Sequence, residues 1–342
     1  MLKKVLAMLL LFCMLPAAVA ETLTMTFVGD CTLGCHYEWF RDERSFVKVI
    51  EREGMDYPFK LVRDVFLNDD MTVVNFEGVL ADKNSYMLSG RKYNFRGPTS
   101  YVQILRDAGV EVATLGNNHC TDFGNEGFRN TQKILSDNGI GAPRAEDYYI
   151  FEKNGIRIGI ISYISNVYER NLKKFPQYVS MLKKEKGCAA VVLCIHAGKE
   201  YSFKHDSTQR NYARKAIDAG VDLVIGHHPH VLQGMTVYKN RNVVYSLGNF
   251  SFGGNRRIQK EHYHSMAVQV EMTFEEGKYV GQQLTVLPAI NTGSLESNNY
   301  QPYWATGELA HEVMNILQKD TDYTLAPYVE GEGAKQAYLP AQ

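Results

Sequence analysis

Three histidines stand within four residues of the sequence, in the stretch VIGHHPHVLQG. They are His227, His228 and His230, and Pro229 separates the last two. Imidazoles this close repel one another when protonated and leave lone pairs unused when neutral, and a divalent metal ion is the usual group that binds such lone pairs. A polar loop after a buried strand would explain the same stretch, so the histidines alone do not decide between the two.

Other polar residues stand at the ends of further short apolar runs. The runs cover residues 23–29, 71–76, 111–116, 156–164, 189–195, 221–226 and 242–248. The polar residues at or just after their ends, besides the three histidines, are Asp30, Asn75, Glu77, Asn117, Asn118, His119, His196 and Asn249. In parallel α/β sheets the carboxyl ends of the strands line one crevice, where ligands bind. We therefore expect these side chains to meet at one edge, although each alone has a structural alternative such as a helix cap, a turn or a hydrogen-bonded core histidine.

This set of side chains predicts a divalent metal site. Carboxylate, imidazole and amide ligands that need no thiolate suit Mn, Fe or Zn, and the ligand types do not choose among the three. One catalytic zinc needs about three protein ligands, and this set is larger. The surplus predicts two ions about 4 Å apart, bridged by the carboxylate of Asp30 or Glu77, an arrangement suited to displacement at phosphorus.

The elements that must position these residues alternate between strands and helices. Helix-like segments fall at 98–109, 125–139 and 207–220, between the apolar runs. Such alternation indicates an α/β core with mainly parallel pairing. Asn154-Gly155 is a tight-turn signal between two alternating runs, and a second antiparallel pair is expected to turn near Gly277. The expected fold is a sandwich of two mixed β-sheets flanked by helices.

The two ends of the chain differ from this central part. Residues 1–20 have the pattern of a secretory signal peptide, with Lys3 and Lys4 before an apolar stretch and small residues at Ala18 and Ala20. We expect cleavage after Ala20 and an exported protein that is secreted, periplasmic or held at the outer face of the cytoplasmic membrane. Residues 21–293 form the expected domain, and 294–342 are expected to be a peripheral helix, near 306–317, and a tail.

Composition narrows the function classes. The chain has 342 residues, 45% of them hydrophobic, and a formal net charge of −1. This balance argues against recognition of nucleic acid by bulk charge. Export permits disulfides, yet cleavage would leave an odd number of cysteines, of which Cys31 and Cys35 could pair or contact a metal.

Six ordered segments resemble the calcineurin-like metallophosphoesterases, and more closely their CapA/PgsA branch, the poly-γ-glutamate capsule synthesis proteins. The segments span residues 27–252 and read FVGDCTLG, VVNFEGVL, TLGNNHCTDFG, VVLCIHAGKEY, VIGHHPHVLQG and VVYSLGNFSF. The resemblance implies a metallophosphoesterase-like fold. It also implies metal ligation by Asp30, Glu77 in the bridging position, Asn118, His196, His228 and His230. His119 would be the proton donor to a leaving oxygen.

Two residues depart from the broader phosphoesterase pattern. Cys31 and Thr32 follow Asp30 where that pattern has Asp-x-His, and Glu77 replaces the usual aspartate. Both features are typical of the CapA/PgsA branch. They imply a first metal position that is weak or filled by other ligands.

The remaining candidates would support the ligands or meet the substrate. We expect Asp122 to keep His119 protonated, and His227, Asn75 and Asn117 to lie behind the ligands. Asn249 could brace the histidine loop. Glu200 and Tyr201, just after His196, either face the site or pack in a loop. Arg96, with its neighbours Arg91 and Lys92, either meets an anionic substrate or lies on a solvated face.

The resemblance implies a role in synthesis or export of an anionic polymer of the poly-γ-glutamate kind, with a phosphoesterase-like hydrolase site. The expected partners are the polymer or a phosphoester substrate and a membrane-bound capsule synthase. Two alternatives stay open at this point. One is a scaffold that binds polymer or synthase without chemistry, and the other is a general secreted metallophosphoesterase.

Overall fold

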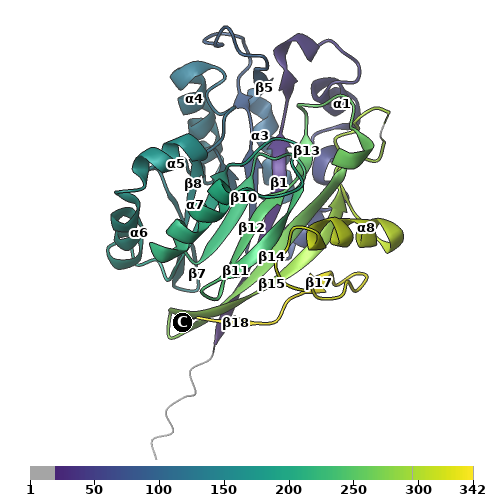
Figure 1. The fold of residues 1–342 in the computed structure, drawn as a ribbon. Helices are drawn as coiled ribbons and strands as arrows, with labels where there is room; N and C mark the ends of the chain where they lie inside the picture. The colour runs from purple at the N-terminus through teal and green to yellow at the C-terminus, as the bar shows by residue number, and fades with distance from the viewer. Residues whose placement is uncertain (1–19, 295, 342) are drawn as a thin grey trace, which may run out of the picture.

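Two large mixed β-sheets pack face to face in the computed structural model, which describes residues 20–294 and 296–341 (Figure 1). The strands of the first sheet are β1 (Glu21–Thr32), β3 (Met71–Phe76), β6 (Val112–Thr114), β13 (Asn249–Phe252), β14 (His264–Glu275), β15 (Lys278–Ile290), β16 (Tyr303–Trp304), β17 (Ala334–Lys335) and β18 (Leu339–Pro340). Their order is β16-β15-β14-β1-β3-β6, with β13 beside β1, and β17 and β18 beside β15. Strands β1, β3 and β6 run parallel.

The second sheet has the order β11-β12-β10-β9-β8-β7. Its strands are β7 (Tyr149–Lys153), β8 (Ile156–Ile164), β9 (Ala190–His196), β10 (Leu223–His227), β11 (Leu232–Tyr238) and β12 (Arg241–Leu247). Strands β8, β9, β10 and β12 are parallel, and β7 and β11 add antiparallel edges. A small sheet of β2 (Cys35–His36), β5 (Phe95–Gly97) and β4 (Val79–Leu80) lies near the start of the chain.

Helices α1 to α7 cover the outer faces of the two sheets, and α8 packs into the core between them. The helices are α1 (Phe46–Glu53), α2 (Arg63–Leu67), α3 (Val102–Ala108), α4 (Gly124–Asp137), α5 (Ser165–Asn171), α6 (Phe175–Lys184), α7 (Ser207–Asp218) and α8 (Gly307–Gln318). Helices α1 to α4 share one buried cluster with the first sheet, and α5 to α7 share another with the second. In β3, Met71 and Val73 face the space between the sheets while Val74 and Phe76 face the helices, as the two-residue period of a strand requires. Because both faces are covered, the strand is apolar along most of its length.

The predicted fold class is confirmed, and both predicted turns are present. Asn154 and Gly155 have φ of 53° and 78°, the left-handed pair that a two-residue hairpin needs between β7 and β8. Glu276 and Gly277 have φ of 49° and 74° between β14 and β15. The three predicted helices correspond to α3, α4 and α7 within a few residues.

The C-terminal segment is built into the sandwich rather than lying apart from it. We expected it to be peripheral, but α8 buries Ala310, Val313 and Leu317 in the core between the sheets. Strands β16, β17 and β18 pair with β15, which would otherwise expose an unpaired edge. The division of the chain at residue 293 stays a prediction. The predicted signal peptide falls on residues 1–20, nearly all of which lie outside the described residues.

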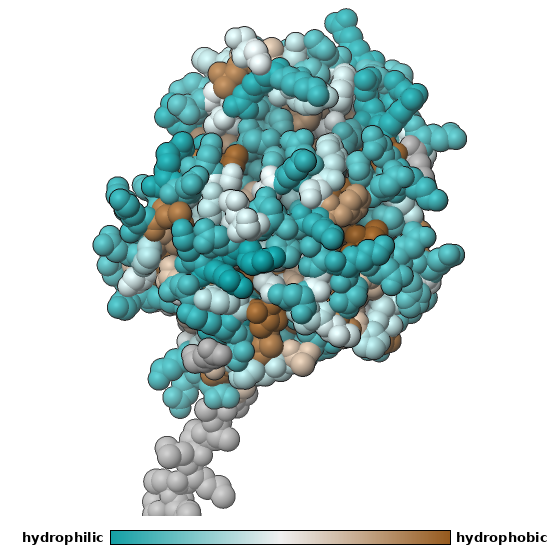
Figure 2. All heavy atoms as spheres, in the orientation of Figure 1, coloured by the Kyte–Doolittle hydropathy of each residue, from teal (hydrophilic) through white to brown (hydrophobic). Residues whose placement is uncertain are grey.

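The cysteines and the surface complete the description of the fold. Cys31, Cys35, Cys120, Cys188 and Cys194 are buried and free, so Cys31 and Cys35 do not pair. Within residues 20–294 and 296–341, no helix has the length and apolar character needed to cross a bilayer. Figure 2 shows that one face of the molecule is largely hydrophilic, with hydrophobic side chains in small separate patches.

Candidate metal centre

The carboxyl ends of strands from both sheets bring the predicted residues to one edge. Asp30 pairs in register with Asn75 and with Asn249, and His196 pairs with His227. The chain at Gly29, in β1, passes close to the residue before β13. Only glycine fits there, because a Cβ would lie 2.1 Å from the carbonyl oxygen of Gly248. This geometry gathers the side chains that the sequence placed at separate strand ends.

The histidine loop that follows β10 is held in a strained backbone conformation. His228 and His230 have φ of 100° and 59°, a region that costs a residue with a side chain about 1–3 kcal/mol. The His228 amide donates to Asp30 Oδ2 over 3.2 Å, and the Pro229 carbonyl accepts from the Tyr201 amide over 2.8 Å. These bonds fix the loop against β1 and against the loop after β9.

Asp30 is a buried carboxylate with several partners. Asn75 Nδ2 donates to Oδ1 over 2.8 Å, and Nδ1 atoms of His227 and His230 lie 3.2 Å from Oδ1 and Oδ2. Burial alone would raise the pKa of Asp30, but the imidazoles of His227 and His230 outweigh it and hold this pKa well below its usual value. Asp30 is therefore ionised, and the His227 ring lies against its Oδ1 atom.

Glu77 is the buried carboxylate without partners. Its side chain is fully buried, and neither Oε1 nor Oε2 has a hydrogen-bond partner among the described residues. Oε1 lies 3.8 Å from His119 Nε2 and 3.9 Å from the Nε2 atoms of His196 and His230. Burial raises the pKa of Glu77 to about 7. An unpaired buried carboxylate is costly unless a cation binds it, so the residues present fit a metal ion next to Glu77.

His196 and Asn118 point their ligand atoms at each other. The distance between His196 Nε2 and Asn118 Oδ1 is 2.8 Å. Burial, followed by the nearby His228, lowers the pKa of His196 well below its ordinary value. Because Oδ1 can only accept, Nε2 carries the proton in this contact, and a neutral imidazole without that proton would offer its Nε2 lone pair beside Oδ1 to one ion.

Two groups of three side chains could each hold an ion. The first is Asp30, Glu77 and His196, and the second is Glu200, His228 and His230; within each group one ligand atom per residue lies within 4.8 Å of the others. We call them the buried triad and the loop triad. Glu200, which the sequence placed near the site without a role, thus joins the possible ligands. Its position four residues after His196 was the available signal.

His119 is in contact with a buried acid, Asp122. His119 Nδ1 lies 2.7 Å from Asp122 Oδ2, and Asp122 is fully buried. The second carboxylate oxygen accepts from Arg91 Nη1 over 2.6 Å, and the same nitrogen donates to the Asn118 carbonyl over 2.8 Å. The ring nitrogen Nε2 is left to face Glu77.

Of the basic residues in GRKYNFRGP, Arg91 reaches the site and Arg96 does not. The Arg96 guanidinium donates to Asn84 Oδ1 and the Ala81 carbonyl over 2.6 and 2.8 Å, and it lies 3.9 Å from the Phe40 ring centroid. It is almost buried and pins the loop after β4. Arg96 therefore has a packing role in place of the candidate substrate contact, because Asn84, the Ala81 carbonyl and the Phe40 ring hold its guanidinium.

The other supporting residues brace the ligands. Asn249 Oδ1 lies 2.8 Å from His230 Nδ1. Asn117 Nδ2 donates to the Phe76 carbonyl over 2.8 Å, and its Oδ1 accepts from the His119 amide over 3.1 Å. Asn117 therefore couples β3 to the turn that carries His119. Tyr201 is 44% exposed, with its ring 6.0 Å from that of His230, so it lies at the mouth of the site.

The position that holds a histidine in the broader phosphoesterase pattern has another use here. Thr32 Oγ1 donates to the Glu77 carbonyl over 2.7 Å. Thr32 therefore fixes the backbone of Glu77 and offers no imidazole. The carboxylate of Glu200 enlarges the ligand set from the opposite sheet.

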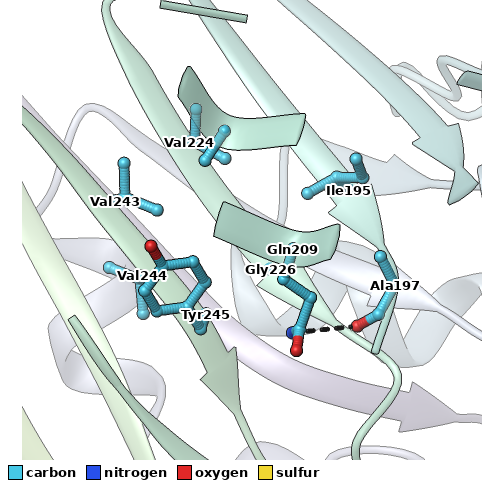
Figure 3. A pocket seen from close by; sticks show the side chains of 9 residues that line it. Ile195, Ala197, Gln209, Val224, Gly226, Val243, Val244 and Tyr245 are labelled. Atoms are coloured by element: carbon cyan, nitrogen blue, oxygen red, sulfur yellow. Dashed lines mark hydrogen bonds between the residues drawn. The ribbon is translucent and has the colours of Figure 1, made fainter. Parts of the chain in front are cut away.

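A second hollow nearby has no chemical groups of this kind. Figure 3 shows a small cavity between α7 and strands β9, β10 and β12, lined largely by apolar side chains such as Ile195, Val224 and Val243. Gln209 closes it by donating to the Ala197 carbonyl over 3.2 Å. It is a packing gap behind the sheet rather than part of the metal centre.

Most of the chain matches a known protein family. Residues 24–254 match the family model described as "Bacterial capsule synthesis protein PGA_cap". This match covers more than half of the chain, and the protein belongs to that family. The resemblance to the CapA/PgsA branch, first drawn from six short segments, is thereby confirmed.

Several relatives carry names that are consistent with this family. "Capsule biosynthesis protein CapA" of Bacillus anthracis is 33% identical over 256 residues, which are 68% of this chain and 60% of that protein. "PGA biosynthesis protein CapA" of Bacillus subtilis is 29% identical, covering 68% of this chain and 64% of that protein. "Probable polyglutamine synthesis accessory protein Rv0574c" of Mycobacterium tuberculosis is 20% identical, covering 65% of this chain and 70% of that protein. The match thus spans less than two thirds of each Bacillus protein.

Proposed function

We propose that this protein acts in the synthesis or export of an anionic capsule polymer of the poly-γ-glutamate kind, and that its metal centre catalyses hydrolysis or transfer at a phosphoester or related bond. Family membership and the names of the two Bacillus relatives support the first part. One observation carries the second part: Glu77 is fully buried, lacks hydrogen-bond partners among the described residues and faces three imidazoles.

The residues have distinct roles in this proposal. Two divalent ions, of Mn, Fe or Zn, would neutralise negative charge on the substrate and activate water. The buried triad and the loop triad would hold them, Asn118 would add an amide oxygen, and Glu77 would bridge. The bonds from Asn75, His227 and the His228 amide keep Asp30 in place.

His119 would supply the proton. Because Asp122 accepts at Nδ1, the proton on Nε2 is the one available to a leaving oxygen on the Glu77 side. Arg91 orients Asp122 from the other side and places a positive charge at the rim. His119 therefore resembles a general acid whose imidazole ring is held in one orientation by Asp122.

The setting of this activity is also proposed. Residues 1–20 have the pattern of a signal peptide, so we infer that the protein acts outside the cytoplasm, either secreted, periplasmic or at the outer face of the cytoplasmic membrane. The description of one relative as a synthesis accessory protein supports a membrane-bound capsule synthase as partner.

The test is a His119→Ala variant with His311→Ala as control, since His311 is an exposed histidine on α8. Hydrolysis of a panel of phosphoesters is measured beside bound Mn, Fe and Zn by elemental analysis. We expect His119→Ala to lower turnover about 10²- to 10⁴-fold with metal content unchanged, and His311→Ala to change neither. Turnover unaffected by His119→Ala, or no binding of any of the three metals, would contradict the proposal.

A non-catalytic scaffold for polymer or synthase is the second candidate. The observation that favours it is Thr32, whose hydroxyl serves the backbone of Glu77 where a phosphoesterase would have an imidazole ligand. Capsule formation in cells separates the two roles. A scaffold supports it equally well with His119→Ala, whereas an enzyme does not.

A further inference from the structure

An open pocket of about 360 Å³ lies in the region of the metal centre and is lined by basic and aromatic side chains. We call it the cationic pocket and define it by Trp39, Arg44, Tyr93, Asn255, Arg256 and Arg257. None of these residues belongs to the ligand triads. The segments that form it come from the start of the chain, the loop before β5 and the loop after β13.

Aromatic contacts join this pocket to the catalytic residues. The Tyr93 ring stacks on Phe95 with centroids 5.9 Å apart, and Phe95 lies 4.4 Å from the His119 ring. On the other side, Phe252 lies 6.1 Å from Phe95 and 4.9 Å from the His230 ring. The cationic pocket is therefore only one ring removed from His119.

The positive charge of the three arginines in the pocket exceeds the negative charge of the acids that pair with them. Arg44 and Arg256 share one carboxylate, that of Asp42. Arg257 is exposed and pairs with no acid among the described residues. The whole chain has a formal net charge of −1, so this surplus of positive charge is local and not a general property of the surface.

The arrangement of the guanidinium groups fits a carboxylate. Arg44 Nε and Nη2 lie 3.2 and 3.1 Å from the two oxygens of Asp42, the paired geometry in which arginine binds a carboxylate. The Arg256 guanidinium also lies 4.4 Å from the Trp39 ring centroid, and such stacking limits its freedom. Asp42 thus shows which anion these side chains accept, while Arg257 remains for a ligand.

We propose that the cationic pocket binds a carboxylate of an acidic oligomer whose chain continues toward the metal centre. The identification of this oligomer with the capsule polymer rests on the proposed function, but binding of the carboxylate needs no metal. The pocket would set which part of the chain lies at His119, and so determine the substrate class of the site.

The test is titration calorimetry of the chelator-treated protein with tetraglutamate, tetraglutamine and inorganic phosphate. The variant is Arg257→Glu, and the control is Lys278→Glu, which makes the same charge change at the β14–β15 turn, at the opposite end of the strands. We expect tetraglutamate to bind, Arg257→Glu to weaken it about tenfold or more, and Lys278→Glu to leave it unchanged.

Three results would overturn the proposal. These are no tetraglutamate binding at millimolar concentration, equal weakening by both variants, and binding of tetraglutamine or phosphate as tight as that of tetraglutamate. Failure of the metal centre leaves this titration unaffected, because the protein is metal-free. If the cationic pocket does not bind tetraglutamate, the metal content and the His119→Ala result are unaffected. The two proposals are therefore tested separately.

Discussion

The buried triad and the loop triad meet at one edge of the sandwich but are built differently. Asp30, Glu77 and His196 lie in strands or directly after them and are all buried. Glu200 is exposed, and His228 and His230 lie on a loop with positive φ. Strand pairing fixes the first group in place, whereas the second depends on a few loop contacts. We therefore expect the buried triad to bind its ion more tightly and the loop triad to adapt to substrate.

Glu77 connects the two groups. Its Oε1 lies equally far, at 3.9 Å, from His196 of the buried triad and His230 of the loop triad. In the two-ion centre that we propose, a carboxylate in this position would be the bridging ligand. A substitution at Glu77 should therefore affect both triads, and a substitution at Glu200 should affect the loop triad alone.

The largest effect is expected from Glu77→Gln. The amide keeps the size of the side chain but removes the negative charge that faces the three imidazoles, so both ions should be lost. We expect metal content to fall from two equivalents to near zero. The loss of metal affinity should exceed the factor of about 10 to 100 that is typical when a residue supporting a ligand is removed. Elemental analysis after dialysis measures it.

The matched control for this change is Glu185→Gln, on an exposed glutamate at the end of α6. It should retain all bound metal. If Glu77→Gln retained one full equivalent, Glu77 would serve a single ion and would not bridge.

Glu200→Gln is expected to have a smaller and one-sided effect. Glu200 serves only the loop triad and remains close to solvent, so the first ion should be retained. We expect the second equivalent to bind about 10- to 100-fold more weakly, measured by titration of metal-free protein with Mn or Zn. Equal weakening of both equivalents would show that the two triads act as one site.

The sequence predicted the edge of the sheet better than the loops. Asp30, Glu77 and His196 could be placed because apolar runs reveal strands, and the ends of parallel strands meet at one edge. For Glu200 the sequence left two alternatives, facing the site or packing in a loop, because its position depends on the bond between the Tyr201 amide and the Pro229 carbonyl. Loop contacts of this kind leave no periodic signal in the sequence.

Basic residues show the same limit. Arg91 and Arg96 stand five residues apart in one charged segment, and residue type does not tell them apart. Arg96 lies in β5 and its guanidinium is held by the loop after β4, whereas Arg91 lies in the preceding loop and reaches Asp122. The C-terminal segment looked peripheral because it is polar, but the open edge of β15 and the apolar face of α8 draw it into the sandwich.

The smallest effect is a dependence of metal affinity on pH. In the metal-free protein burial raises the pKa of Glu77 to about 7. Burial lowers the pKa of His230, but the Glu77 and Asp30 carboxylates outweigh it and raise this pKa to about 10. The two neighbours therefore hold at least one proton near neutral pH, and an ion must displace it. Since a protonated ligand cannot bind metal, affinity should rise with pH by up to about tenfold per unit between pH 6 and 8.

Calorimetry of metal binding in buffers of different ionisation enthalpy measures this proton release. We expect protons to be released when metal binds at pH 7, while Asp30, whose pKa lies well below its usual value, contributes none. Glu77→Gln removes the carboxylate that contributes to the high pKa of His230, so any residual binding in this variant should release fewer protons. Heats that are the same in every buffer would mean that the site is already deprotonated, and Glu77 would then have a partner that stabilises its charge.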